Sequence, residues 1–243
     1  MARFLRIAHR GASGDFPENT RLAFEKAIEA GADMIEIDCQ LTKDGHVVVF
    51  HDERLNRTAG VKGSVNGKTL EQLKKLEIGG WRKKSFQGQR ILTLEEVLEG
   101  VAGKADLCVE IKQFTGSPSG IEIKILFTLS HFDYLDQTIL SSFHYPCLER
   151  IRELAPEARI GLTYGAGVRE DPFPVAEQLG AGSIHVQKEM ATREFLDRAW
   201  ADGLDVYVWT VNEVRDMERF LSLGVQGIIS DYPEKFWKLK FRH

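Results

Sequence analysis

Two hydrophobic patterns alternate along almost the whole chain. Short runs in which every second residue is apolar are typical of strands, and segments with apolar residues three or four positions apart are typical of helices. Residues 3–9 show the first pattern and residues 19–30 show the second. The Thr-Leu-Glu-Glu sequence that starts at Thr93 has the form of a helix N-cap with an acidic third position. It predicts a helix that ends near Gly100 or Gly103.

The alternation continues to the end of the chain and amounts to eight strand-then-helix units. Strands are expected at 3–9, in the first arm of a hairpin within 34–52, and at 107–112, 138–143, 159–164, 183–186, 206–211 and 227–231. Helices are expected at 19–30, from 93 onward, and at 121–129, 147–154, 174–179, 193–201 and 213–223. Eight such units in 243 residues predict an α/β protein with a (β/α)8 TIM barrel.

Residues 53–90 interrupt this regular pattern. They are rich in glycine and contain one short helical segment at 70–76. We expect them to form a short insertion after the second strand, within a single domain that spans residues 1–243.

The hairpin expected within residues 34–52 carries the most informative polar residues. Glu36 and Asp38 point to one side of its first arm, and Ile35, Ile37 and Cys39 point to the other, because side chains alternate along a strand. The two carboxylates would lie about 7 Å apart and are costly to bury without a cation. A solvated amphipathic hairpin is the alternative. However, the apolar face also needs cover, which favours the enclosed strand of an α/β protein.

The return arm of the hairpin is expected to bring a histidine next to these carboxylates. An Asp-Gly pair at 44–45 is typical of a two-residue loop, because glycine tolerates the positive φ that such loops require. With that loop, Lys43 pairs with His46, and Asp38 lies directly opposite His51 on the same face. The hairpin therefore predicts a metal site with an acid/base group beside it.

Further polar residues fall at the C-terminal ends of the expected strands, where (β/α)8 barrels have their active sites. They are His9, Arg10, Glu110, Lys112, Ser141, Ser142, Trp209, Thr210, Ser230 and Asp231. The carboxylates of Glu36, Asp38 and Glu110 form a hard-oxygen set, which favours Mg²⁺ or Ca²⁺, with Mn²⁺ as a further option, over Zn²⁺.

Two histidines and two cations complete the candidate site. Near neutral pH, the imidazoles of His9 and His51 can either remove or donate a proton. Arg10 and Lys112 carry cations suited to phosphate oxygens, although Arg10 points away from His9 unless the chain turns at Gly11. A metal, two imidazoles and two cations together indicate cleavage of a phosphate ester by in-line displacement.

Composition and charge narrow the function further. The chain is 43% hydrophobic and 28% charged, as expected for a globular protein with an extensive core. Its net charge of −4 argues against nucleic-acid binding, since no basic excess is available to neutralise phosphates. Three widely spaced cysteines form neither a disulfide framework nor a zinc motif. No signal peptide and no apolar run of about 18 residues is evident. We therefore expect a cytoplasmic protein without stable membrane insertion.

Several motifs resemble those of the glycerophosphodiester phosphodiesterase family, in the family's order and over nearly the whole chain. HRG at 9–11 and PENT at 17–20 resemble its first signature. EIDCQLTKDGHVVVFHD at 36–52 resembles its second, with Cys39 where valine is usual. Further matches are GKTLEQLKKL, the GGW that ends at Trp81, LTLEEVL, VEIK, SSF, VWTVN and GIISDYP. Leu92 stands where a proline often precedes TLEEV.

The resemblance implies hydrolysis of a small-molecule glycerophosphodiester to sn-glycerol 3-phosphate and an alcohol, with one divalent cation as cofactor. It implies Glu36, Asp38 and Glu110 as metal ligands, His9 and His51 as the acid/base pair, and Arg10 and Lys112 as phosphate contacts. Trp209 is expected to face the barrel mouth and pack on the glycerol or the headgroup, with a plain core tryptophan as the alternative.

Other functions and residue roles stay open at this point. A lysophospholipase-D-like activity needs an apolar entrance, for which Ile78, Trp81 and Phe86 are the candidates. A lyase that releases a cyclic phosphate is a second enzymatic alternative, and a silent metabolite-binding barrel is a non-catalytic one. A sensor has no need of two acid/base imidazoles, which argues against the last. Asp231 is expected to hold either His51 or Arg10. Residues 18–19 are expected to cap the first helix and tether the HRG loop.

Overall fold

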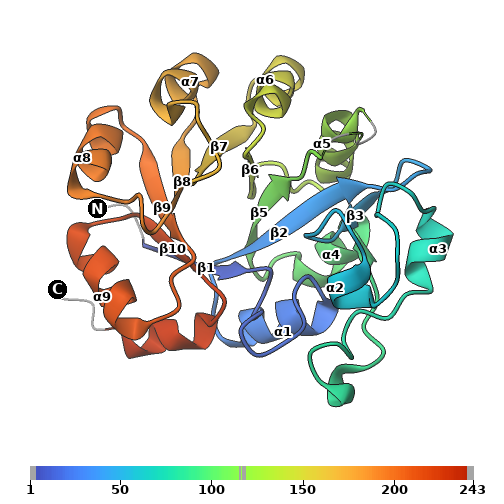
Figure 1. Ribbon diagram of the computed structural model, residues 1–243. Coiled ribbons are helices and arrows are strands. Elements are labelled where there is room, and N and C mark those ends of the chain that lie inside the picture. The colour runs from blue at the N-terminus through green and yellow to red at the C-terminus, as the bar shows by residue number, and fades with distance from the viewer. Residues whose placement is uncertain (1–3, 115, 117–118, 240–243) are drawn as a thin grey trace.

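Eight parallel strands close on themselves at the centre of the computed structural model, which describes residues 4–114, 116 and 119–239 (Figure 1). In barrel order they are β1 (Leu5–His9), β2 (Met34–Leu41), β5 (Asp106–Ile111), β6 (Thr138–Ser142), β7 (Arg159–Tyr164), β8 (Ser183–Gln187), β9 (Asp205–Trp209) and β10 (Gly227–Ser230). The barrel is closed because β1 pairs with both β10 and β2, where His9 lies opposite Glu36. Arg3, the expected start of the first strand, lies outside the described residues.

Helices surround this barrel on the outside (Figure 1). They are α1 (Arg21–Glu29), α4 (Leu94–Val101), α5 (Ile121–His131), α6 (Tyr145–Leu154), α7 (Pro172–Leu179), α8 (Arg193–Ala201) and α9 (Val214–Leu223), followed by a 3₁₀ helix, η2 (Pro233–Lys238). The predicted (β/α)8 barrel is therefore confirmed. None of the described helices has the length and apolar character needed to cross a bilayer.

Threonine caps set where several helices begin. The predicted cap at Thr93 is present: its hydroxyl accepts from the backbone N of Glu96 (3.3 Å), and the Glu96 carboxylate accepts from the backbone N of Thr93 (2.9 Å). The first helix begins later than expected, because Thr20 is its N-cap and accepts from the backbone N of Ala23. The prediction that residues 18–19 cap this helix is therefore wrong.

Two separate sets of apolar side chains enclose the barrel strands. On β2, Ile35, Ile37 and Cys39 belong to the large cluster between the strands and the outer helices. A second cluster draws one side chain from each of six strands and fills the barrel interior: Ile7, Met34, Cys108, Ile139, Tyr207 and Ile229. Two residues further along, and therefore on the same inward face, come His9, Glu36, Glu110, Ser141, Trp209 and Asp231. The predicted faces of β2 are confirmed, and the polar residues form the next inward layer.

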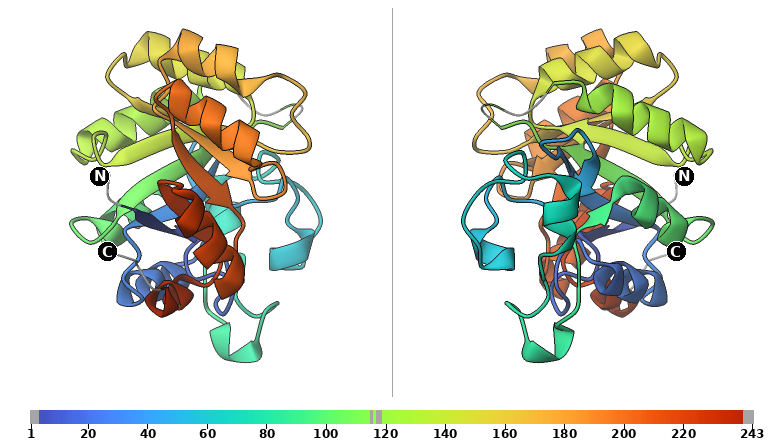
Figure 2. Two further views of the ribbon diagram at one scale, coloured as in Figure 1. Left: turned by 90° about the vertical axis from the view of Figure 1, so that its left-hand side faces the viewer. Right: turned by 90° about the vertical axis from the view of Figure 1, so that its right-hand side faces the viewer.

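The segment from the return arm of the hairpin to the start of α4 lies on one side of the barrel, opposite α7 and α8 (Figure 1). It contains β3 (Val47–Val49), α2 (Asn56–Ala59), α3 (Leu70–Lys74), a 3₁₀ turn η1 (Lys84–Phe86) and β4 (Leu92–Thr93). β3 and β4 extend the sheet in antiparallel fashion from β2. The loop that carries η1 projects from the body of the molecule (Figure 2). A small apolar cluster of its own supports the segment: Val48, Phe50, Leu55, Val65, Leu73, Ile78 and Ile91.

The predicted register of the hairpin is wrong by one residue. Cys39 pairs with Val49 and Leu41 with Val47, so Asp38 is not opposite His51. The loop has three residues, 43–45: Thr42 N donates to the carbonyl O of His46 (2.9 Å), and the loop ends in a glycine with φ of 80°. This register directs Val47 and Val49 toward the main core and Val48 toward the small one, so each apolar side chain of β3 is buried.

Candidate active site

A pocket of about 300 Å³ opens at the C-terminal ends of the barrel strands. It is lined by His9, Arg10, Glu36, His51, Glu110, Lys112, Ser141, Phe143, Thr163, His185, Trp209, Thr210 and Ile229. Seven of the eight predicted site residues are in this set. The eighth, Asp38, is fully buried and contacts Arg10 and Lys112. The structure therefore brings all eight together.

Glu36, Asp38 and Glu110 form an acidic cluster that could hold a metal ion. Each offers a carboxylate oxygen, and these atoms all lie within 4.8 Å of one another. Burial raises the pKa of Glu36 well above its usual value, and the nearby charges of Asp38 and Glu110 add to this rise. Oε1 of Glu36 is buried and has no hydrogen-bond partner within the described structure. An unsatisfied carboxylate oxygen in a hard-oxygen set fits a divalent cation.

The cations in the site compensate only part of this charge. Burial disfavours the charged form of Asp38, but Lys112 and Arg10 outweigh it and hold the pKa of this carboxyl well below its usual range. Arg10 and Lys112 both contact Asp38, so Glu36 receives less compensation, and the raised pKa of Glu36 reflects this. A bound divalent cation would supply the positive charge that favours the ionised form of Glu36.

Arg10 reaches the site because the chain turns at this residue. Arg10 has φ of 55° and Gly11 φ of 81°, and a Cβ on Gly11 would lie 2.7 Å from the backbone carbonyl of Ala23. As a result, the backbone N of Arg10 donates to Glu36 Oε2 (3.0 Å), and its Nε lies 3.2 Å from Asp38 Oδ2. The requirement for a turn at the HRG motif is met.

Lys112 lies one residue beyond the end of β5. Its Nζ is 3.0 Å from Asp38 Oδ1, donates to Glu110 Oε1, and lies 5.8 Å from the centre of the Phe143 ring. Burial alone would lower the pKa of this ammonium, but Asp38 and Glu110 raise it above its usual value. The group therefore stays charged at the edge of the pocket.

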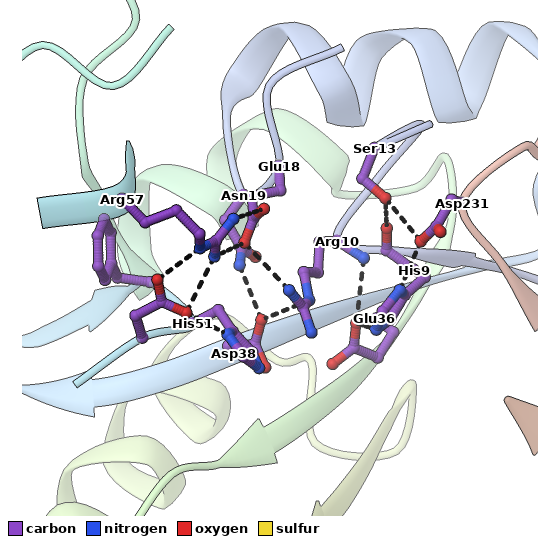
Figure 3. Close-up of polar contacts among 12 residues, drawn as sticks. His9, Arg10, Ser13, Glu18, Asn19, Glu36, Asp38, His51, Arg57 and Asp231 are labelled. Carbon is purple, nitrogen blue, oxygen red and sulfur yellow. Dashed lines mark hydrogen bonds and ion pairs between the residues drawn. The ribbon is translucent and has the colours of Figure 1, made fainter. Parts of the chain in front are cut away.

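Asp231 holds the ring of His9. Nδ1 of His9 lies 2.6 Å from Asp231 Oδ1, and the same carboxylate accepts from Ser13 Oγ (3.0 Å) (Figure 3). It also accepts from Asn212 Nδ2 (2.7 Å). Burial opposes the charged form of Asp231, but the hydrogen bond with His9 and its charge lower the pKa to about 2. The expectation that Asp231 holds His51 or Arg10 is wrong. Nε2 of His9 remains free to face Glu36 at 4.0 Å.

His51 has its own carboxylate, supplied by the next residue. Nδ1 of His51 lies 2.7 Å from Asp52 Oδ1. Burial lowers the pKa of His51, Asp38 opposes this shift, and the cations Arg10 and Lys112 reinforce it. The buried amide of Gln40 donates to the backbone carbonyls of Phe50 (2.6 Å) and Asp52 (2.9 Å). These two bonds direct the chain toward the pocket after β3 ends. His51 therefore reaches the pocket although it does not lie opposite Asp38.

Other residues around the pocket were assigned less specifically by the sequence. Asn19 donates from Nδ2 to Asp38 Oδ2 (2.8 Å), and Glu18 accepts from Arg10 Nη1 (3.1 Å). Trp209 lines the mouth, where its ring lies 5.6 Å from that of Phe143 and its Nε1 donates to the carbonyl of His185. Burial lowers the pKa of His185 to about 3, so this histidine is neutral at physiological pH.

Lys112→Met is expected to lower kcat by roughly 10²–10³-fold, because a donor aimed at developing phosphoryl charge acts strongly in a partly dehydrated site. Steady-state kinetics together with a thermal melt measure this. Lys124→Met, at an exposed position in α5, is the matched control and should leave kcat unchanged. A Lys112→Met protein that melts earlier yet keeps the wild-type kcat would make Lys112 a structural lysine.

The fold and site define a (β/α)8-barrel protein with an acidic cluster, two carboxylate-bonded histidines and two cations at the C-terminal ends of its strands. The model of the glycerophosphoryl diester phosphodiesterase family matches residues 9–235. A glycerophosphodiester phosphodiesterase of Caldanaerobacter subterraneus subsp. tengcongensis is 42% identical over 229 residues, covering 94% of each chain. One of Bacillus altitudinis is 35% identical over 238 residues, covering 96% of this chain and 97% of the relative.

A solved structure is similar over the same extent. An Oleispira antarctica phosphodiesterase in complex with its product sn-glycerol-3-phosphate superimposes with a TM-score of 0.89 at 29% identity, covering 96% of this chain and 94% of that one. The chain therefore belongs to the glycerophosphodiester phosphodiesterase family. Its identification from the motifs as an enzyme of this family is confirmed.

Proposed function

We propose that the protein hydrolyses glycerophosphodiesters to sn-glycerol 3-phosphate and an alcohol, with one divalent cation, Mg²⁺, Ca²⁺ or Mn²⁺, held by Glu36, Asp38 and Glu110. When bound, such a cation supplies a positive charge that orients phosphoryl oxygens and offsets their developing charge. His9 and His51 are the acid/base pair of this proposal.

The observation that carries the proposal is the placement of the two imidazoles. His9 lies beside Glu36 at one end of the acidic cluster, and His51 lies beside Asp38 at the other (Figure 3). Each ring is bonded through Nδ1 to a carboxylate, so each keeps Nε2 for chemistry in the pocket. An in-line displacement needs proton transfer on both sides of the phosphorus, and this arrangement supplies a group for each.

The residues of the chain divide the work as follows. Lys112 and Arg10 bind and orient the phosphate oxygens, since both cations line the pocket. His9, held by Asp231, removes the proton of the attacking oxygen, which is water or the glycerol 2-hydroxyl. His51, held by Asp52, donates a proton to the leaving alkoxide. A glycerol 2-hydroxyl attack gives a cyclic phosphate, which water then opens.

The substrate range is tested with glycerophosphocholine, its lyso-lipid analogue and a synthetic phosphodiester. Product analysis by ³¹P NMR should find sn-glycerol 3-phosphate from glycerophosphocholine. A cyclic phosphate as the end product would favour the lyase, and faster release of choline from the lyso-lipid would favour the lysophospholipase-D-like activity. Of the expected apolar entrance residues, Ile78 is buried in the small core and is unavailable to a lipid chain. No turnover of any of the three would contradict the proposal.

We also propose that residues 1–243 form one domain with residues 53–90 as its insertion. Apolar side chains of the insertion pack in one cluster with Val48 of β3, and β3 pairs with the barrel strand β2. This packing supports a single domain. Action in the cytoplasm on a free small molecule, without a nucleic-acid partner, belongs to the same proposal and rests on the composition.

A further inference from the structure

Arg57 of α2 binds two carboxylates at once. Its Nη1 and Nη2 donate to Glu18 Oε2 (2.6 Å) and Oε1 (2.8 Å). Its Nε and Nη2 donate to Asp52 Oδ2 (2.6 Å) and Oδ1 (2.9 Å). Both carboxylates are thus held in a two-point manner, which the planar fork of a guanidinium allows and the point charge of a lysine does not.

Each of the two carboxylates that Arg57 binds also contacts a residue that lines the pocket. Glu18 Oε1 also accepts from Nη1 of Arg10 (3.1 Å), and Asp52 Oδ1 lies 2.7 Å from Nδ1 of His51. Arg57 itself lies beside the site (Figure 3), and its side chain is 40% exposed. It therefore connects the support of a phosphate-binding cation with the support of an acid/base imidazole.

The Asp52–His51 bond decides which nitrogen of His51 works in the pocket. Burial opposes the charged form of Asp52, but hydrogen bonds from Arg57 and His51 lower its pKa. An ionised carboxylate only accepts, so Nδ1 of His51 carries a hydrogen and Nε2 is left for the substrate. Without Arg57, Asp52 loses two of its bonds, and the His51 ring loses the support that fixes its tautomer and angle.

The insertion covers this arrangement on one side. The Trp81 ring centre lies 5.6 Å from the guanidinium carbon of Arg57, and Trp81 Nε1 donates to the carbonyl of Ile78 (2.9 Å). The indole ring attracts the cation of Arg57 and so favours its place beside the two carboxylates.

We propose that Arg57 is a positioning residue that holds the Asp52–His51 and Glu18–Arg10 pairs in one rigid arrangement. It acts through these pairs and does not touch the substrate. The inference rests on the proposed function, because it takes His51 as an acid/base group.

The test compares Arg57→Ala and Arg57→Lys with the wild type. Loss of a residue that supports a functional side chain typically costs about 10–100-fold, so Arg57→Ala should lower kcat on glycerophosphocholine by that factor. Arg57→Lys keeps the charge but not the fork and should restore only part of the loss. Arg54→Ala is the matched control, because this exposed arginine of the same segment makes no ion pair within the described structure.

A mutant cycle that also removes both carboxylates separates positioning from general destabilisation. If Arg57 acts through Asp52 and Glu18, adding Arg57→Ala to a variant that carries Asp52→Asn and Glu18→Gln should cost less than about 3-fold more, whereas independent effects multiply. Should Arg57→Ala fail to fold, Arg57→Lys takes its place in the cycle. Multiplying effects, or a wild-type kcat for Arg57→Lys, would overturn the inference.

A spectroscopic measurement distinguishes failure of the inference from failure of the proposed function. The ¹⁵N shifts of the His51 ring should report a hydrogen on Nδ1 in the wild type and in Arg54→Ala, and a mixture of tautomers in Arg57→Ala. An unchanged tautomer in Arg57→Ala overturns the inference. Inactivity of the wild type on all phosphodiesters refutes the proposed function, while the tautomer shift still tests the role of Arg57.

Discussion

Treatment with EDTA is expected to abolish hydrolysis of glycerophosphocholine, and Mg²⁺, Ca²⁺ or Mn²⁺ is expected to restore it. The carboxylate oxygens of Glu36, Asp38 and Glu110 lie within 4.8 Å of one another, and the neighbouring cations do not bring the pKa of Glu36 down to its usual value. Like charges this close repel strongly in a buried site. Initial rates measured on chelated protein, before and after each cation is added back, give the result directly.

A thermal melt tests the same site without reference to activity. A cation that binds only the folded protein should stabilise it by about 2.7 kcal/mol at a concentration 100 times its Kd. Glu36→Gln should remove most of this stabilisation together with the activity, because Glu36 Oε1 is a buried carboxylate oxygen without a hydrogen-bond partner in the described structure. Glu177→Gln, an exposed position in α7, should behave like the wild type. Full turnover by protein shown to be free of metal would refute the assignment.

The barrel could be predicted from the sequence because each of its elements has a local signal. The strand at Arg159–Tyr164 and the helix at Arg193–Ala201 have the predicted bounds, since an apolar pattern of one period ends there and another begins. The start of α1 was placed too early. Asn19 takes a positive φ of 55° and turns its side chain to Asp38, which lies 19 residues further along the chain. A contact of that kind leaves no local pattern.

The register of the hairpin was predicted wrongly for a similar reason, because it depends on contacts between residues that are distant in sequence. Asp-Gly at 44–45 is compatible with a two-residue loop, but the same glycine can also end a three-residue loop. The choice depends on where the side chains of Val47, Val48 and Val49 are buried, and their two apolar clusters include residues far away in sequence. His51 still reaches the pocket, because Gln40 binds the chain on either side of it.

The residues that face the pocket were predictable, whereas some of their supports were not. His9, Glu36 and Glu110 each follow an inward apolar residue by two positions, so the strand period places them in one layer. The contacts of Asp231 and Arg57 form only when segments far apart in sequence meet in the fold. Asp231 bonds a histidine 222 residues away, and Arg57 bonds a glutamate 39 residues away. Two supports had a local signal: Asp52 is adjacent to His51, and residues 18–19 tether the HRG loop as expected, since Glu18 accepts from Arg10 Nη1 and the backbone N of Asn19 donates to the carbonyl of Arg10.

The two histidines should respond differently to the leaving group. On the p-nitrophenyl ester of glycerol 3-phosphate, whose leaving group needs no proton, His51→Ala should cost little. On glycerophosphocholine, the same variant should lose about 10²–10⁴-fold in kcat, and His9→Ala should lose a similar factor on both esters. The glycerol half is the same in the two substrates, so only the demand for an acid changes. His131→Ala, at an exposed position at the C-terminal end of α5 and outside the pocket lining, is the matched control.

The opposite order of roles has a distinct signature in this experiment. Burial and the cations Arg10 and Lys112 lower the pKa of His51, which favours its neutral ring before substrate binds. A bound phosphodiester brings a negative charge beside the ring and works against that shift, so protonated His51 is favoured in the complex that reacts. If the bound substrate did not favour protonated His51, the neutral ring would accept a proton, and His51 would be the base. His51→Ala would then be as damaged on the p-nitrophenyl ester as on the choline ester, while His9→Ala would be spared on the p-nitrophenyl ester.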